Sequence, residues 1–302
     1  MTDTLSKTSL VTTHIARSFQ PFSSQVRIDV SGLTHVGLLR ANNEDQFYIA
    51  RMSRALETMS TSLAETDVPA RAEEVNYAMV LADGMGGHAA GEVASRMAIS
   101  MLISLVLELP NWILKVDDDA TDEIEKRSRS IVRKVGAVMF KEGHDHAELR
   151  GMGSTLTIAR SLGRDLLIIH VGDSRAYLLR GGTLNRLTRD HTYAQMLVDC
   201  GRLDACDLAD SGVRHILTNA LGGSTADVDV DVDLLQLENG DRLMLCSDGL
   251  SDLVDDEAIT KTLLAKPVSK DACEQLVQMA LDAGGRDNVT VVVAAYNFPA
   301  AD

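Results

Sequence analysis

The hydrophobic pattern of this chain consists mainly of short apolar runs of strand length, separated by polar turns. One run, Tyr77 to Ala82, ends on Asp83 and a glycine-rich turn, which predicts a buried strand with a carboxylate at its end. A hairpin turn at Gly181-Gly182 joins two further runs. The predicted strands are residues 26–30, 47–50, 77–82, 154–159, 166–171, 176–179, 183–187, 228–232, 243–246 and 289–296.

Apolar residues at helical spacing predict helices in the middle of the chain and near its end. We expect Asp255 and Ser269 to cap two of them and Gly284-Gly285 to terminate the last. Residues 51–74 are longer than an ordinary connection, which predicts an insertion with some helix of its own. The predicted helices run from Gly91 to Pro110, from Ile124 to Gly143, from Tyr193 to Cys200, from Asp255 to Leu264 and from Ser269 to Gly284.

The order of these elements indicates the fold class. Two groups of strands enclose a helix pair, and the strand–helix alternation of a parallel sheet is absent. This order favours an α+β fold, a layered sandwich with antiparallel sheets in the middle. Residues 1–25 are rich in Ser and Thr and lack sustained periodicity, which predicts a flexible N-terminal tail.

Composition and charge narrow the classes of partner. Lys and Arg number 29 against 44 Asp and Glu, so the formal net charge of −15 argues against a generic nucleic-acid or anionic-membrane binder. The charge fits a cation-binding protein, and acidic solubility explains it equally well. The four cysteines lack zinc-binding spacing and predict free thiols in a reducing cytosol. With no N-terminal apolar segment and no apolar run near ~18 residues, we expect a cytoplasmic protein without membrane attachment.

Acidic residues recur at the ends of predicted strands: Asp83, Asp173 and Asp248 follow a strand, Asp252 lies one helical turn after Asp248, and Asp287 precedes the last strand. An isolated Asp-Gly pair is usually a turn or a helix cap, but several strand ends of this kind favour a shared site. Two carboxylates about 4 Å apart repel by roughly 4 kcal/mol at an effective dielectric of 20. A group of them is tolerated only with cations between them or with raised pKa values. Oxygen ligands favour Mg²⁺ or Mn²⁺.

Other polar segments carry weaker signals. Asp117 to Asp119 form an acidic stretch that favours a solvated link over a site. Residues 202–223 are irregular and rich in Gly and Asp, which predicts a mobile loop. Asp227, Asp229, Asp231 and Asp233 alternate with valines, and we interpret them as the solvated face of a half-buried strand rather than a metal site.

Seven short motifs follow one another between residues 28 and 296. They are Arg40-Ala-Asn-Asn-Glu44-Asp45, Asp83-Gly-Met-Gly-Gly-His88-Ala-Ala-Gly-Glu92, Gly151-Met-Gly-Ser-Thr155-Leu156, Val171-Gly-Asp173-Ser-Arg175-Ala-Tyr177, Leu187-Thr-Arg-Asp190-His191, Cys246-Ser-Asp248-Gly-Leu-Ser-Asp252 and Gly285-Arg-Asp287-Asn288-Val-Thr290. Each motif is weak alone. In this order and spacing, they resemble the motifs of the metal-dependent protein phosphatases of the PPM, or PP2C, family in their bacterial form.

The resemblance implies a four-layer α-β-β-α sandwich, with two central, mostly antiparallel sheets flanked by helices, as a single phosphatase domain at residues 26–298. It also implies two Mn²⁺ or Mg²⁺ ions and a third, weaker one. The implied ligands are Asp83 as the bridge, the Gly84 carbonyl at one ion, Asp248 and Asp287 at the other, Glu44 and Asp45 through bound waters, and Asp173 and Asp252 at the third ion.

The resemblance further implies that Arg40 holds the substrate phosphate as a bidentate clamp. In the implied mechanism, a metal-bridging water becomes hydroxide and attacks phosphorus in line, without a covalent enzyme intermediate. The residues 202–223 correspond to the family's flap over the site. Met85 stands where eukaryotic members have a histidine that acts as the general acid. His88 is the candidate substitute, and a solvent-facing turn histidine is the alternative.

Four functional hypotheses follow. The first is a Ser/Thr protein phosphatase that acts on phosphorylated proteins and reverses a Hanks-type kinase. The second is a catalytically weak member that binds phosphoproteins, against which the presence of Arg40, Asp83, Asp248 and Asp287 counts. The third, a two-metal phosphodiesterase or nuclease, is disfavoured by the net charge. The fourth, a structural or scaffold role, is the least favoured, because a scaffold has no use for clustered carboxylates.

We expect four other histidines to be structural: His35, His170, His191 and His215.

Overall fold

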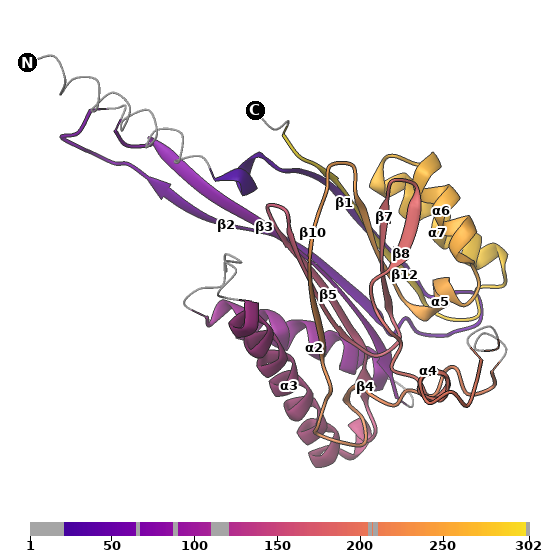
Figure 1. Ribbon diagram of the computed structural model, residues 1–302. Helices are drawn as coiled ribbons and strands as arrows, with labels where there is room; N and C mark the ends of the chain where they lie inside the picture. Colours follow the sequence, from indigo (N-terminus) through magenta and orange to yellow (C-terminus); the bar gives the residue numbers. More distant parts are fainter. Residues whose placement is uncertain are drawn as a thin grey trace, which may run out of the picture.

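Two antiparallel sheets pack against each other, and helices cover the outer side of each (Figure 1). The computed structural model describes residues 21–64, 67–86, 90–109, 121–204, 207 and 211–299. Every strand pairing within these ranges is antiparallel. The predicted four-layer α-β-β-α architecture is therefore confirmed.

The first sheet comes mainly from the C-terminal half of the chain. In order, its strands are β1 (Arg27–His35), β12 (Val289–Asn297), β11 (Arg242–Cys246), β7 (Arg175–Arg180) and β8 (Thr183–Arg186). The helices on its outer face are α5 (Asp248–Ser251), α6 (Asp256–Ala265) and α7 (Ser269–Asp282). Asp255 caps α6 as predicted, because its Oδ1 accepts the Ala258 N–H at 2.8 Å.

The second sheet has seven strands, and the central one is β3. In order, the strands are β10 (Asp231–Gln236), β6 (Asp165–Val171), β5 (Leu156–Leu162), β3 (Arg71–Met85), β4 (Gly153–Ser154) and β9 (Leu221–Gly222), with β2 (Asp45–Glu57) also paired to β3. The long helices α2 (Ala90–Leu107) and α3 (Thr121–Asp145) cover its outer face. Short elements complete the fold: η1 (Phe22–Gln25), η3 (Ala147–Leu149) and α4 (Tyr193–Asp199).

Alternate side chains of β3 enter two different apolar layers. Met79 and Leu81 point into the layer between the sheets, where they meet residues of β11 and β12. Val80 and Ala82 point the other way, into the layer beneath α2 and α3. Because both faces of the strand are buried, its sequence is a continuous apolar run rather than an alternating one. The same burial fixes the register and hence the position of Asp83 at the strand's end.

The predicted helical insertion at residues 51–74 is wrong. Residues 51–57 continue β2 and residues 71–74 begin β3, so the two strands form a long ribbon that extends beyond the rest of the sheet (Figure 1). Arg51 pairs with Glu73 at 2.8 Å across the two strands. The outward charges hid the strand pattern, because they replace the apolar residues that a half-buried strand shows.

The strand predicted at 228–232 lies a few residues too early, since β10 begins at Asp231. The alternation itself is correct, because Val228, Val230 and Val232 are all buried. Before the ladder starts, the Asn219 side chain pairs with the Asp229 backbone, donating to its carbonyl at 2.7 Å and accepting from its N–H at 3.2 Å. The Asn219 side-chain amide thus makes the hydrogen bonds to the Asp229 backbone that a neighbouring strand makes elsewhere in the sheet.

The predicted N-terminal tail lies only partly within the described residues. Residues 1–20 lie outside the described ranges, whereas Phe22–Gln25 form η1, which packs on β3: Ser23 accepts the Val75 N–H at 3.2 Å.

Helix α2 is long and apolar enough, by length and composition alone, to cross a membrane. Since a core helix of a soluble protein passes the same test, and α2 packs on β3 and α3, this single helix is weak evidence of a span.

The predicted Ser269 cap of α7 is also wrong. Ser269 is the first residue of the helix, and its hydroxyl donates to the Asp29 carbonyl at 2.7 Å. The cap comes instead from the neighbouring β1, where the Asp29 carboxylate accepts the Ser269 N–H at 2.7 Å. A carboxylate at this end of a helix also interacts favourably with the helix dipole.

We therefore predict that Asp29→Ala destabilises the fold by about 1 kcal/mol, because the helix loses its capping acceptor. At about 2–4 °C per kcal/mol, the melting temperature should fall by a few degrees. Asp29→Asn keeps an acceptor oxygen and should lose less. Equal losses for the two variants, or none for either, would show that this contact does not cap α7.

Candidate active site

A cleft of about 630 Å³ lies at the end of β3, the start of α5 and the turn before β12. The site residues predicted from the sequence that line it are Arg40, Glu44, Asp83, Gly84, Asp173, Asp248, Asp252 and Asp287. His88 lies outside the described residues. The fold thus brings together side chains that are up to 247 residues apart, as in the Arg40–Asp287 pair.

Asp45 lies directly opposite Asp83, because the β2–β3 register pairs these two residues. Its side chain is buried, with 1% of its surface exposed. The Ser247 hydroxyl donates to Asp45 Oδ2 at 2.7 Å, whereas Oδ1 has no hydrogen-bond partner among the described residues. An unpaired buried carboxylate oxygen is costly, so this atom marks a position where a cation or an ordered water fits.

Close backbone contacts hold the end of β3 against the start of α2. A side chain at Gly84 would place its Cβ 2.0 Å from the Gly91 carbonyl oxygen, so only glycine fits there. A Cβ on Gly91 would in turn meet the Glu44 carboxylate at 2.5 Å. Gly84 also donates its N–H to the Glu44 carbonyl at 3.1 Å. The loop before β2 is therefore packed tightly around the carboxyl end of β3.

The buried Asn288 side chain organises the loop that carries Arg40. Its amide donates to the carbonyls of Val36 and Asn42, each at 2.9 Å, and its oxygen accepts the Glu44 N–H at 2.7 Å. All of its polar atoms are thus used to fix the loop against β12. Arg40 then reaches across the cleft mouth and donates to Asp287 at 2.6 Å. Its side chain is 54% exposed and accessible to a ligand.

A hydroxyl chain connects the Asp83 backbone to the loop of Asp173. Thr155 Oγ1 accepts the Asp83 N–H at 2.9 Å and lies 2.9 Å from the Ser174 hydroxyl. Ser154 donates to the Asp83 carbonyl at 3.0 Å. Because Ser154, Thr155 and Ser174 are buried, these bonds hold the two aspartates rigidly relative to each other.

The carboxylates of the cleft raise one another's pKa values. Burial raises the pKa of Asp45 to about 6 and that of Asp173 to about 7, and the neighbouring negative charges add to the second shift. The pKa values of Asp83 and Asp248 are raised well above the ordinary value, first by burial and then by the other aspartates. Such a group of acids is stable in its charged form only with positive charge among its members.

Sequence reasoning missed several residues of the cleft. His215, predicted to be structural, is exposed and lines the cleft beside Asp252. Arg214 and Arg286 also line it, so arginines surround the acidic centre. No motif marks Arg214 and His215, because they lie in the irregular segment 202–223. Arg286, by contrast, lies within the last motif, next to Asp287.

The other histidines predicted to be structural have structural contacts. His35 Nδ1 accepts the Gly37 N–H at 2.9 Å. His170 is buried between Thr157 and backbone carbonyls, and burial lowers its pKa to about 3, so it stays neutral. His191 contacts Asp231 at 3.0 Å, away from the cleft lining. Met85 lines the cleft, and its thioether has no proton to give to a leaving group.

Comparison with known proteins matches this architecture to a family. The model of protein phosphatase 2C matches residues 67–284. The chain belongs to the protein phosphatase 2C family. It is 38% identical over 259 residues to the Ser/Thr protein phosphatase PstP of Mycobacterium tuberculosis, covering 85% of this chain and 43% of PstP. It is 30% identical over 272 residues to the protein phosphatase PhpP of Streptococcus pneumoniae, covering 89% of this chain and 98% of PhpP.

Solved structures of this family have the same fold. The crystal structure of M. tuberculosis PstP superposes with a TM-score of 0.70 at 34% identity, covering 89% of this chain and 99% of the crystallised one. The PstP catalytic domain in complex with two manganese ions gives a TM-score of 0.69 at 34% identity, with 90% and 99% covered. This protein phosphatase 2C chain spans less than half the length of the PstP sequence it matches.

The raised pKa values predict that the metal-free protein loses stability as the pH rises. Unfolded aspartates titrate near pH 3.9, so between about pH 4 and 7 the folded state binds more protons than the unfolded state. The stabilisation is therefore complete below pH 4 and is lost as the pH rises through the folded pKa values. For Asp45 alone, with a folded pKa of about 6, the stabilisation lost between pH 5 and pH 7 is about 1.3 kcal/mol.

Denaturant unfolding in EDTA at pH 5 and pH 7 measures this difference. Asp45→Asn should reduce it by about that amount, because the amide does not titrate. Asp122→Asn, an exposed change on α3, should leave it unaltered. If Asp45→Asn keeps the full pH dependence of the wild type, Asp45 does not titrate as its burial predicts.

Proposed function

We propose that this protein is a metal-dependent Ser/Thr protein phosphatase that hydrolyses phosphoserine and phosphothreonine in proteins. The observation that supports it best is the group of partly buried aspartates in one cleft, with an arginine at its mouth. The names of the bacterial relatives agree with this proposal.

The donor set fits divalent cations. Carboxylate and carbonyl oxygens are the ligands that Mn²⁺ and Mg²⁺ prefer. The raised pKa of Asp83 means that its carboxylate needs positive charge nearby to stay ionised, and the unpaired Asp45 oxygen adds a buried acceptor atom. The two manganese ions in the PstP catalytic domain support the same metal. The residues that would hold two ions are Asp83, the Gly84 carbonyl, Asp248 and Asp287, with Glu44 and Asp45 acting through water. Bound cations would supply Lewis acidity toward phosphate oxygens and a water of lowered pKa.

The chain's own residues bind and orient the substrate. Arg40 has the planar fork that matches two phosphate oxygens, and Asn288 and Asp287 fix its position beside the acidic centre. Arg214 and Arg286 offer further positive charge to a phosphorylated chain at the cleft mouth. His88 remains the predicted donor of a proton to the leaving alkoxide.

Several finer statements are part of the same proposal. We propose that residues 26–298 act as a single phosphatase domain, that its substrates are phosphorylated by a cognate Hanks-type Ser/Thr kinase, and that it works in the cytoplasm, without nucleic-acid or membrane partners. Cys246 and Cys273 are buried free thiols, which suits a reducing compartment. A catalytically weak, phosphoprotein-binding member is not favoured, because every described carboxylate of the predicted site lies in or beneath the cleft.

The proposal predicts that Asp83→Asn lowers kcat at least about a thousandfold, roughly 4 kcal/mol of transition-state stabilisation, because a neutral amide holds cations poorly. The assay is hydrolysis of a phosphothreonine peptide with Mn²⁺, and EDTA should abolish it for the wild type. Asp271→Asn, an exposed change on α7, is the matched control and should keep full activity. Near-normal turnover of Asp83→Asn with an intact fold would remove Asp83 from the reaction.

Arg40→Ala should mainly raise KM for the phosphopeptide. A lost pair of charged hydrogen bonds is worth about 1.5–3 kcal/mol, which corresponds to roughly 10- to 150-fold. Arg40→Lys should recover only part of the loss, because an ammonium group lacks the fork. The exposed Arg150→Ala is the control. An unchanged KM in Arg40→Ala would mean that other residues hold the phosphate.

A further inference from the structure

The buried His191 ends one of the seven sequence motifs, and its ring contacts three different segments of the chain. Its Nδ1 accepts the Gly172 N–H at 3.2 Å and lies 2.8 Å from the amide nitrogen of Asn219. Its Nε2 lies 3.0 Å from Asp231 Oδ2. The side chain is only 8% exposed, and it is not among the residues that line the cleft. Any effect of His191 on the reaction must therefore pass through the segments that it contacts.

These hydrogen bonds fix one tautomer of the ring. The Asp229 backbone sets the orientation of the Asn219 amide, whose oxygen accepts the Asp229 N–H at 3.2 Å and whose nitrogen donates to the Asp229 carbonyl at 2.7 Å. The second hydrogen of that nitrogen is then directed at His191 Nδ1. Because Nδ1 accepts both Gly172 and Asn219, the ring proton is on Nε2 and is donated to Asp231.

One of the contacted segments carries Asp173. The His191 N–H donates to the Gly172 carbonyl at 2.7 Å, so the ring and the backbone of His191 both hold Gly172. The same carbonyl contacts His170 Nε2 at 3.0 Å, and the buried Ser174 hydroxyl is hydrogen-bonded on the other side of Asp173. This loop has several anchors besides the His191 ring, so the loss of the ring should displace it little.

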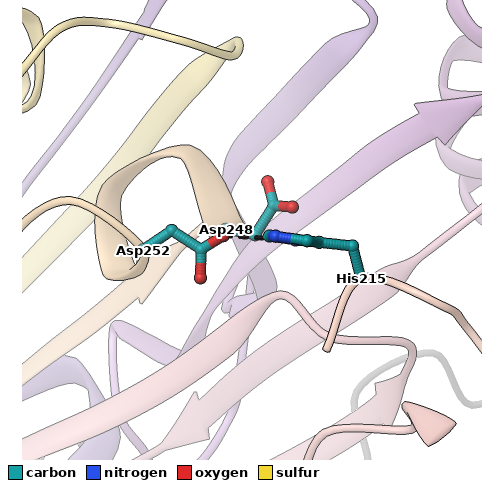
Figure 2. Close-up of side chains that lie close together, drawn as sticks. All are labelled: His215, Asp248 and Asp252. Atoms are coloured by element: carbon teal, nitrogen blue, oxygen red, sulfur yellow. Dashed lines mark ion pairs between the residues drawn. The ribbon is translucent and has the colours of Figure 1, made fainter. Parts of the chain in front are cut away.

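A second contacted segment, residues 213–219, carries Arg214 and His215 to the cleft. Figure 2 shows His215 pointing toward the two aspartates of α5 and its C-terminal end. Where the segment leaves the cleft, the Thr218 N–H donates to the His191 carbonyl at 2.9 Å, and the next side chain binds the His191 ring. The ring therefore helps to set how Arg214 and His215 stand over the cleft.

We propose that His191 is a positioning residue for substrate binding, which holds residues 213–219 so that Arg214 and His215 face a phosphorylated chain in the cleft. The inference rests on the proposed function, since it concerns how the same cleft binds a protein substrate. A phosphopeptide that extends to the cleft mouth should sense the loss of the ring. A small phosphate ester, which reaches only the acidic centre, should sense it far less.

Steady-state kinetics of the full chain with Mn²⁺ tests this difference on two substrates, a phosphothreonine peptide and p-nitrophenyl phosphate. His191→Leu removes the acceptor at similar size and should raise KM for the phosphopeptide about five- to tenfold. The kcat/KM for p-nitrophenyl phosphate should change by less than about twofold. His191→Asn keeps an acceptor close to the position of Nδ1 and should recover part of the loss. His146→Leu, at an exposed histidine outside the cleft lining, is the control.

A double-mutant cycle shows whether His191 acts through Asn219. Asn219→Ala breaks the bond between the ring and the segment, and it should raise KM for the phosphopeptide as His191→Leu does. The double variant should then show no more than the larger of the two single effects, because both changes remove the same link. If His191→Leu does not fold, Asn219→Ala must still show the selective increase in KM.

Tryptic cleavage after Arg214 in the metal-free protein gives a readout that needs no activity. His191→Leu and Asn219→Ala should each speed this cleavage about tenfold, because the segment opens more often, and His146→Leu should not.

Three results overturn the proposal: an unchanged KM for the phosphopeptide in both variants, equal losses on the two substrates, or fully additive effects in the cycle. Equal losses would mean that His191 supports the reaction centre through Asp173. A wild-type chain that hydrolyses no phosphopeptide defeats the proposed function instead. In that case an unchanged cleavage rate after Arg214 would also defeat the role of His191, and a raised rate would retain it.

Discussion

Repulsion among carboxylates at the edge of two sheets is the constraint on which the rest of this structure depends. Asp45 and Asp83 face each other across one strand pair, and Asp248 and Asp287 approach from the other sheet. Because like charges repel, this close approach of carboxylates is unfavourable without a positive charge among them. The surrounding fold has to hold the acids in place, and a metal offsets the repulsion when bound.

Uncharged side chains hold the carboxylates of the cleft in position. Ser247 binds Asp45 while also accepting the Thr290 N–H, so it joins the two sheets through one hydroxyl. The Thr155 hydroxyl accepts the Asp83 backbone N–H, and Asn288 fixes the loop before β2. Neutral donors and acceptors fix geometry without neutralising the acids, which leaves the negative charge available to a cation. Removing one of them would displace a ligand rather than change the net charge of the site.

The sequence was informative where burial imposes a pattern. The apolar run of β3 is buried on both faces, so its end and Asp83 could be located, and seven ordered motifs indicated which strand ends converge. The distal ribbon escaped prediction because its partner strand, rather than an apolar core, stabilises it. His215 escaped because no periodicity or motif marks its loop. The Asp29 cap escaped because donor and acceptor are 240 residues apart.

The ribbon of β2 and β3 has a consequence for association between molecules. Beyond Asn76, toward the ribbon's tip, β3 pairs with no strand other than β2 among the described residues, although Ser23 of η1 accepts the Val75 N–H. Backbone groups along both edges of this stretch therefore lack a strand partner. Exposed Leu56 and Met59 lie near its tip. Arg51 and Arg54, paired with Glu73 and Glu74, place charge along it and oppose the addition of another strand. Because salt screens exposed charges, concentrated salt should weaken the opposition of these ion pairs to a further strand. Any association through the ribbon should therefore increase with ionic strength and should not depend on the metal content of the cleft.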